Sequence, residues 1–167
     1  MKVLGAKAEG WQSLLASILK TEYGIAPLPE LVRGEEGKPF FPQFPALQFS
    51  ISHAGDYVLC ALSDRPVGVD IEVIRSRREG LPRYALTSPE YANYEALGGD
   101  WPAFYTIWTR KEAWCKYVGQ GLRRLWGQTP PREDLHFRSY QGPDWRAAVC
   151  GEEEPPEAIT WLEGPHE

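Results

Sequence analysis

The chain has 167 residues, of which 43% are apolar and 25% charged, and it carries seven tryptophans, eight tyrosines and six phenylalanines. This composition supports a folded core and excludes a disordered chain, and the length suits one domain or two small fused halves. The formal net charge of −5 argues against nucleic-acid binding through bulk electrostatics.

The first half of the sequence predicts one helix followed by three strands. Apolar residues recur at helical spacing over residues 9–23, and Gly24 is suited to end that helix. The segment 26–45 is rich in proline and glycine and predicts mostly loop. Strands are predicted over residues 47–51, 57–62 and 67–73, and their short connections favour one antiparallel sheet.

The second half predicts further helices and a strand-rich tail. Ser88-Pro89-Glu90 is typical of a helix start, and residues 102–118 predict a long helix that Gly119 and Gly121 end. Short strands are predicted near residues 135–140, 145–150 and 158–162. The apolar run into Cys60 is echoed before Cys150, which indicates two related halves, and the predicted fold class is α+β.

Asp70-Ile71-Glu72 lies in a predicted strand, where side chains two residues apart point to the same face. The two carboxylates therefore converge. Hard oxygen ligands of this kind suit Mg²⁺, which is often held by one or two carboxylates together with substrate phosphates. An ordinary solvated strand face gives the same alternation, so the motif alone leaves both interpretations open.

Trp108, Glu112 and Lys116 are spaced four residues apart on the predicted long helix and share one face. They offer a packing anchor, a carboxylate and a cation in order. The alternative is a simple helix-stabilising pair of Glu112 and Lys116, worth about 0.2–0.5 kcal/mol.

A third candidate is Ser50-Ile51-Ser52-His53 at a strand end, followed by Gly55. Hydroxyl, imidazole and backbone N–H groups placed there can bind phosphate. A serine hydrolase is an alternative, but no G-x-S-x-G elbow surrounds either serine, and neighbours on a strand point apart. A structural histidine is the remaining alternative.

Positive charge is concentrated in two stretches. Each stretch can meet an anionic ligand or an acidic partner, and the alternative for either stretch alone is an ordinary solvated surface. The first stretch holds Arg75, Arg77, Arg78 and Arg83, and the second holds Arg110, Lys111, Lys116, Arg123 and Arg124.

The three cysteines, Cys60, Cys115 and Cys150, lack CxxC spacing and histidine neighbours, so neither a zinc site nor a disulfide framework is predicted. The start, MKVLGAKAEGW, has no long apolar core, and no stretch reaches about 18 apolar residues. We therefore expect no signal peptide, no membrane partner and a cytoplasmic location.

Four motifs occur in a characteristic order: Gly37-Lys38-Pro39, Ser52-His53, Asp70-x-Glu72 and Trp108-x-x-Lys111-Glu112-Ala113-x-x-Lys116. Together they resemble the phosphopantetheinyl transferase superfamily, and most of all its Sfp type, whose signature is W-x-x-K-E-A-x-x-K. Residues 49–72 and 108–122 are similar to the central block and the helix block of that family. The resemblance runs from about residue 11 to about residue 162.

The resemblance implies an Mg²⁺-dependent enzyme that moves phosphopantetheine from coenzyme A to a serine of an apo acyl or peptidyl carrier protein and releases 3′,5′-ADP. Asp70, Glu72 and Glu112 fall on the Mg²⁺ ligands of the family, and Glu112 also on the residue proposed to accept the serine proton. Lys116 falls on the lysine near the pyrophosphate, and Lys111 on a lysine expected to support the same catalytic site.

The resemblance also implies where coenzyme A binds. Ser52 and His53 fall on phosphate contacts, and Lys38 and Pro39 on the segment that lines the adenine end. The family fold is a pseudo-dimer of two α+β halves, here residues 1–65 and 66–167, with coenzyme A in the cleft between them. A fused pseudo-dimer of this kind is expected to be a monomer.

The sequence departs from the family in its first half. The segment ahead of Gly37 is shorter than usual, and Gln12-Ser13-Leu14-Leu15-Ala16 stands where the family often has Arg-x-Leu-Leu-Gly. Ser13 stays a candidate phosphate contact, and the cations that could replace the missing ones are Lys2, Lys7 and Arg33. This departure motivates one alternative function, a non-catalytic paralogue that binds coenzyme A or a carrier protein.

Overall fold

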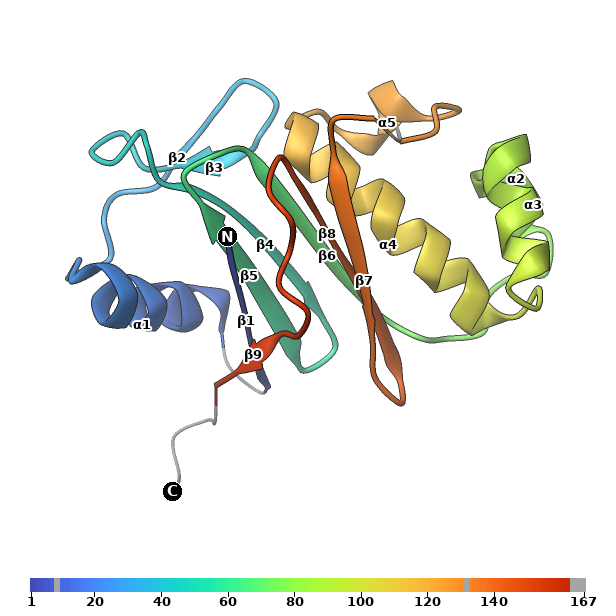
Figure 1. Cartoon of the computed structure of the whole chain (residues 1–167), viewed down its shortest axis with the longest axis horizontal. Helices are drawn as coiled ribbons and strands as arrows, with labels where there is room; N and C mark the ends of the chain where they lie inside the picture. Colours follow the sequence, from blue (N-terminus) through green and yellow to red (C-terminus); the bar gives the residue numbers. More distant parts are fainter. Residues whose placement is uncertain (8–9, 131–132, 163–167) are drawn as a thin grey trace.

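The computed structural model describes residues 1–7, 10–130 and 133–162, and these form two main β-sheets with helices at either side (Figure 1). In chain order the elements are β1 (Lys2–Lys7), α1 (Trp11–Tyr23), β2 (Val32–Arg33), β3 (Pro39–Phe40), β4 (Gln48–Ala54), β5 (Tyr57–Ser63), β6 (Val67–Val73), α2 (Leu81–Ala85), α3 (Ser88–Ala96), α4 (Trp101–Val118), α5 (Leu122–Leu125), β7 (His136–Gln141), β8 (Trp145–Gly151) and β9 (Thr160–Trp161). The predicted α+β class is confirmed.

The first sheet has the strand order β4-β5-β1-β9, in which β5 is antiparallel to both β4 and β1 and the late strand β9 is parallel to β1. Helix α1 packs against it through a fully buried apolar row made of Leu14, Leu15, Ile18 and Leu19. The helix ends as predicted at Gly24, which has a φ of 67°, a conformation that suits glycine. Residue 9, the predicted helix start, lies outside the described residues.

The second sheet has the strand order β6-β8-β7 and is antiparallel throughout. The prediction that β4, β5 and β6 form one sheet is therefore wrong for β6. Strand β6 pairs with β8 over its whole length, from Val67 opposite Gly151 to Val73 opposite Trp145. The reason is that β8 offers β6 a complete ladder, while Val69 and Ile71 bury their side chains in the core between the two sheets.

Helix α4 covers β6 and β8 and carries the W-x-x-K-E-A-x-x-K motif (Figure 1). Asp100 caps its first turn by accepting a 2.8 Å hydrogen bond from the Ala103 N–H group, which satisfies one of the free amide donors there. Ala113 and Cys115 pack on Ala148 and Cys150 of β8. The helix ends at Gly119, as predicted, in a left-handed conformation.

Shorter elements complete the fold. Strands β2 and β3 form a small antiparallel hairpin inside the segment predicted to be mostly loop. Thr87 and Glu90 form a capping box at the start of α3, close to the predicted Ser88-Pro89-Glu90 start. Among the described residues, no helix is long and apolar enough to cross a membrane.

Candidate active site

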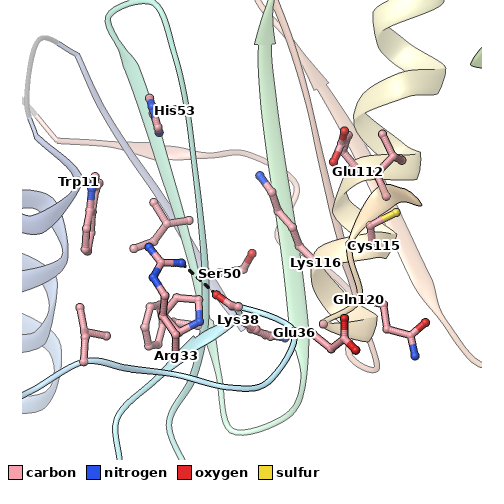
Figure 2. A pocket seen from close by; sticks show the side chains of 18 residues that line it. Trp11, Arg33, Glu36, Lys38, Ser50, His53, Glu112, Cys115, Lys116 and Gln120 are labelled. Carbon is pink, nitrogen blue, oxygen red and sulfur yellow. Dashed lines mark hydrogen bonds between the residues drawn. The ribbon is translucent and has the colours of Figure 1, made fainter. Parts of the chain in front are cut away.

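A pocket of about 470 Å³ lies between the N-terminal elements and α4 (Figure 2). This volume falls within the range of small-molecule sites. One wall comes from α1, the β2–β3 hairpin and β4, and the other from α4 and the turn that follows it. The N-terminal wall is made of Trp11, Leu31, Arg33, Glu36, Gly37, Lys38, Pro39, Phe49, Ser50, Ile51 and His53. The opposite wall is made of Glu112, Cys115, Lys116, Gly119, Gln120, Gly121 and Leu122.

Asp70 and Glu72 do not line the pocket. Asp70 lies on the face of β6 that α4 covers, is paired with the wall residue Lys116, and is only 4% exposed. Its Oδ1 accepts two hydrogen bonds, one from Lys116 Nζ at 2.8 Å and one from Ser52 Oγ at 2.8 Å. Its Oδ2 is buried and has no hydrogen-bond partner. Burial raises the pKa of the Asp70 carboxyl, while Lys116 and Ser52 oppose that rise.

The negative charge of Asp70 acts on the carboxyl groups of both Glu72 and Glu112. Burial, followed by the charge of Asp70, raises the pKa of Glu72 and raises that of Glu112 to about 7. No three acidic, histidine or cysteine side chains in the described part of the chain lie close enough to form a ready-made metal site.

Lys116 and Glu112 both line the pocket, as their shared helix face predicts, and Figure 2 shows the Lys116 side chain reaching from α4 toward the opposite wall. Trp108 does not line the pocket. It stacks on Phe104, with ring centroids 5.8 Å apart, and meets Trp126 edge-on. It is therefore a packing anchor for α4, in agreement with its predicted part in the row.

Lys38, Pro39 and Arg33 bring the β2–β3 hairpin to the pocket. The Lys38 ammonium donates to the Val67 carbonyl at 3.2 Å and to the Tyr117 carbonyl at 3.3 Å, and burial lowers its pKa. Lys38 thus ties the hairpin to β6 and to the end of α4. Arg33 donates to the Gly37 carbonyl at 3.0 Å, as drawn in Figure 2, and remains exposed.

The two other candidate cations lie elsewhere. Lys2 is paired with Glu22, and Lys7 lies over the Tyr57 ring, so neither lines the pocket. Arg33 is the one of the three that can meet an anion there.

His53 is exposed and lines the pocket, whereas Ser52 and Ser13 do not. The Ser52 hydroxyl is buried, donates to Asp70 and accepts the Ile71 N–H group at 3.2 Å, so it is not placed to meet a phosphate. Ser13 is exposed on α1. A Ser52–His53 hydrolase is not supported, because the hydroxyl hydrogen is committed to Asp70.

Lys111 is fully buried, and its Nζ donates to Glu90 Oε2 of α3 at 2.9 Å. It is absent from the pocket wall. The predicted catalytic role for Lys111 therefore lacks geometric support, because the ammonium is sealed inside the α3–α4 contact. Sequence spacing could not separate it from Glu112, its neighbour in the motif.

Several wall residues have no counterpart among the predicted site residues, notably Trp11, Glu36, Cys115 and Gln120. Burial raises the pKa of the Cys115 thiol to about 11, which disfavours a thiolate nucleophile. Gln120 and Gly121 belong to residues 108–122, the stretch that is similar to the helix block of the family, and this similarity is the signal that could have pointed to them.

Comparisons with known proteins identify the family of the chain. A family model described as the 4′-phosphopantetheinyl transferase superfamily matches residues 66–163. The 4′-phosphopantetheinyl transferase AcpT of Salmonella typhi is 41% identical over 120 residues, which is 69% of this chain and 61% of that protein. AcpT of Escherichia coli strain K12 is also 41% identical, over 121 residues, covering 69% of this chain and 60% of that protein. The 4′-phosphopantetheinyl transferase Sfp of Bacillus subtilis strain 168 is 36% identical over 90 residues, covering 53% and 40%.

The chain belongs to the 4′-phosphopantetheinyl transferase superfamily. It matches about three fifths of the length of its AcpT relatives.

Proposed function

We propose that this chain transfers 4′-phosphopantetheine from coenzyme A to a serine of an apo acyl or peptidyl carrier protein, with release of 3′,5′-ADP. The observation that carries the proposal is the Lys116–Asp70 pair beside Glu112 at one wall of a pocket of ligand size, in a chain of this superfamily. In the reaction the serine oxygen bonds to the β-phosphorus, and the bond from that phosphorus to the bridging oxygen breaks.

The residues on the two walls would suit the parts of coenzyme A. Its adenine end would lie along Pro39 and the stem of Lys38, which keep an apolar surface at the hairpin. Its phosphates would meet His53, Arg33 and Lys116, which approach from both walls. Lys116 would then offset negative charge on the phosphate oxygens as the bond to the leaving group breaks.

Asp70, Glu72 and Glu112 would hold Mg²⁺. These residues fit a hard divalent cation, because Oδ2 of Asp70 is a buried oxygen without a partner and the charge of Asp70 contributes to the raised pKa of both Glu72 and Glu112. When bound, Mg²⁺ supplies positive charge to the phosphate oxygens. Glu112 would also accept the proton of the attacking serine, directly or through a water molecule.

The family's pseudo-dimer is also part of the proposal, with halves at residues 1–65 and 66–167. It is supported by the passage of the chain from the first sheet to the second between β5 and β6. Strand β9 returns to the first sheet and ties the end of the second half to the first.

The carrier protein would dock beside the pocket on two exposed aromatic residues, Tyr84 and Trp126, whose rings lie 5.5 Å apart. Arg83 precedes Tyr84, and Arg123 and Arg124 lie just before Trp126, so the pair joins the two basic stretches. Carrier proteins present an acidic surface, which this combination of aromatic and cationic side chains complements.

The test is the intact mass of several purified apo carrier proteins after incubation with this protein, coenzyme A and Mg²⁺. A mass gain of one phosphopantetheine group that EDTA abolishes is expected. Asp70→Ala should abolish the gain with the fold retained, whereas Glu95→Gln, a carboxylate change at an exposed position of α3, should not. No gain with any carrier, while coenzyme A still binds by calorimetry, would instead favour a non-catalytic coenzyme A-binding protein.

A further inference from the structure

Two serines of β4 bridge the two sheets of the molecule. Strands β4 and β6 lie against each other but belong to different sheets. Ser50 Oγ accepts the Val69 N–H group at 3.1 Å, and Ser52 Oγ accepts the Ile71 N–H group at 3.2 Å. Both serines are buried and lie two residues apart, so they share one face of β4.

Ser52 makes one contact that Ser50 does not. Its hydroxyl donates to Oδ1 of Asp70 at 2.8 Å. A serine hydroxyl has a single hydrogen to donate, so this donor is committed to the carboxylate. Lys116 Nζ donates to the same oxygen at 2.8 Å, and the two donors leave Oδ2 buried without a partner.

We propose that Ser52 is a positioning residue for Asp70: together with Lys116 it engages Oδ1, fixes the rotation of the carboxylate, and leaves Oδ2 as the oxygen free to bind a divalent cation. The inference rests on the proposed function, which assigns Asp70 to Mg²⁺. The Ser52 hydroxyl acts on the cation site through Asp70.

Two features of the contact favour this role. The orienting bond is buried, so water does not compete for the serine hydroxyl or the carboxylate oxygen. An unpaired buried carboxylate oxygen is costly to a fold, and a bound cation would satisfy it. Groups that orient a metal ligand by hydrogen bonding commonly change metal affinity when they are removed.

The test is Mg²⁺ binding to the whole protein by calorimetry, without coenzyme A or carrier. Ser52→Ala should weaken Mg²⁺ binding by about 10-fold to 100-fold, the range seen when such orienting groups are lost. Ser52→Thr, which keeps the hydroxyl, should restore it. In the transfer assay, Ser52→Ala should need more Mg²⁺ for half-maximal rate, and saturating Mg²⁺ should recover most of kcat.

Ser50→Ala is the matched control, because it removes the same kind of bridge between the sheets and leaves Asp70 untouched. Its Mg²⁺ affinity should equal that of the wild type, and denaturant unfolding should show a similar loss of stability in both alanine variants. If Ser52→Ala does not fold, Ser52→Cys keeps the side-chain volume and replaces the hydroxyl with a poorer donor.

The outcomes separate this inference from the proposed function. Mg²⁺ affinity at the wild-type level in folded Ser52→Ala, or in Ser52→Cys if the alanine variant is unfolded, overturns the positioning role alone. An equal loss of affinity in Ser50→Ala also overturns it, since a general inter-sheet effect would then explain the result. A wild-type protein that binds no Mg²⁺, either alone or with coenzyme A present, overturns the metal assignment on which the inference rests.

Discussion

Gly68 of β6 lies directly beneath Ala113 of α4, so closely that a Cβ atom added to Gly68 would fall 1.9 Å from the Ala113 carbonyl oxygen. The same atom would lie 2.4 Å from the Tyr117 backbone nitrogen. Both obstacles belong to the backbone of one helix, which cannot move aside as a flexible side chain can. The absence of a side chain at Gly68 therefore sets the distance between β6 and α4, and with it the reach of Lys116 to Asp70.

Gly68→Ala should push α4 away from β6 and destabilise the protein by about 3 kcal/mol, the upper part of the usual range for overpacking. It should also separate Lys116 from Asp70 and so lower transfer. Urea unfolding and the transfer assay measure the two effects. Gly80→Ala is the control, because a Cβ at Gly80 meets nothing within 4 Å, and its stability should change by less than about 0.5 kcal/mol. Wild-type stability in Gly68→Ala would contradict the close contact.

Lys111 and Glu90 form a buried ion pair between α4 and α3, with 0% and 5% of their side chains exposed. Replacing Lys111 alone with Met should leave the Glu90 carboxylate buried without its cation and cost about 3–5 kcal/mol in unfolding free energy. The double variant Glu90→Gln/Lys111→Met should recover most of that loss, since glutamine keeps the capping box with Thr87.

The double variant also tests the role of Lys111 in the reaction. If Lys111 only supports the fold, the folded double variant should transfer at close to the wild-type rate. Lys20→Met, at an exposed position of α1, controls for the loss of a lysine and should leave stability within about 0.5 kcal/mol. Loss of transfer in a stable double variant would return Lys111 to the catalytic group.

Much of the architecture was predictable because local patterns determine it. The β6 alternation places Asp70 and Glu72 opposite Val69 and Ile71, as the structure confirms, and Gly24 and Gly119 end their helices in left-handed conformations. The pairing of β6 with β8 was not predictable, because the two strands are far apart in the chain and several apolar runs could have completed the ladder.

The site was predictable in part for the same reason. Helical spacing predicts that Glu112 and Lys116 share one face of the helix. It does not predict the partner of Lys111, whose ammonium donates to Glu90, a residue 21 positions earlier. The role of Ser52 depends on a contact between β4 and β6 that no motif encodes. The family motifs contain Ser52, Asp70 and Lys111, but spacing along the chain does not determine the contacts that these side chains make with other elements.

Glu112 makes the stability of the metal-free protein depend on pH. Its carboxyl pKa is raised from 4.5 to about 7, so between these values the folded protein binds more protons than the unfolded chain. Stability from this group is therefore greatest at the acid end of the window and falls as the pH rises through about 7. Glu112→Gln should remove that dependence and stabilise the metal-free protein near pH 8.

Urea unfolding at several pH values between 5 and 8, with EDTA present, measures this effect. The raised pKa values of Asp70 and Glu72 act in the same direction, so the variant should flatten the profile only in part. Glu95→Gln serves as the control, and its profile should follow the wild type. A Glu112→Gln profile as steep as that of the wild type would contradict the raised pKa.

The exposed arginines around Tyr84 and Trp126 should govern the encounter with an acidic carrier protein. Arg78→Glu and Arg123→Glu each replace an exposed cation, one from each basic stretch. Each should lower kcat/KM for the carrier by about tenfold at low ionic strength and weaken its salt dependence, because long-range attraction then contributes less to association. The KM for coenzyme A should stay unchanged, because neither residue lines the pocket.

Lys20→Glu reverses an exposed charge on α1 and should change neither the kcat/KM for the carrier nor its salt dependence. If both arginine variants keep the wild-type salt dependence, the carrier docks on another surface.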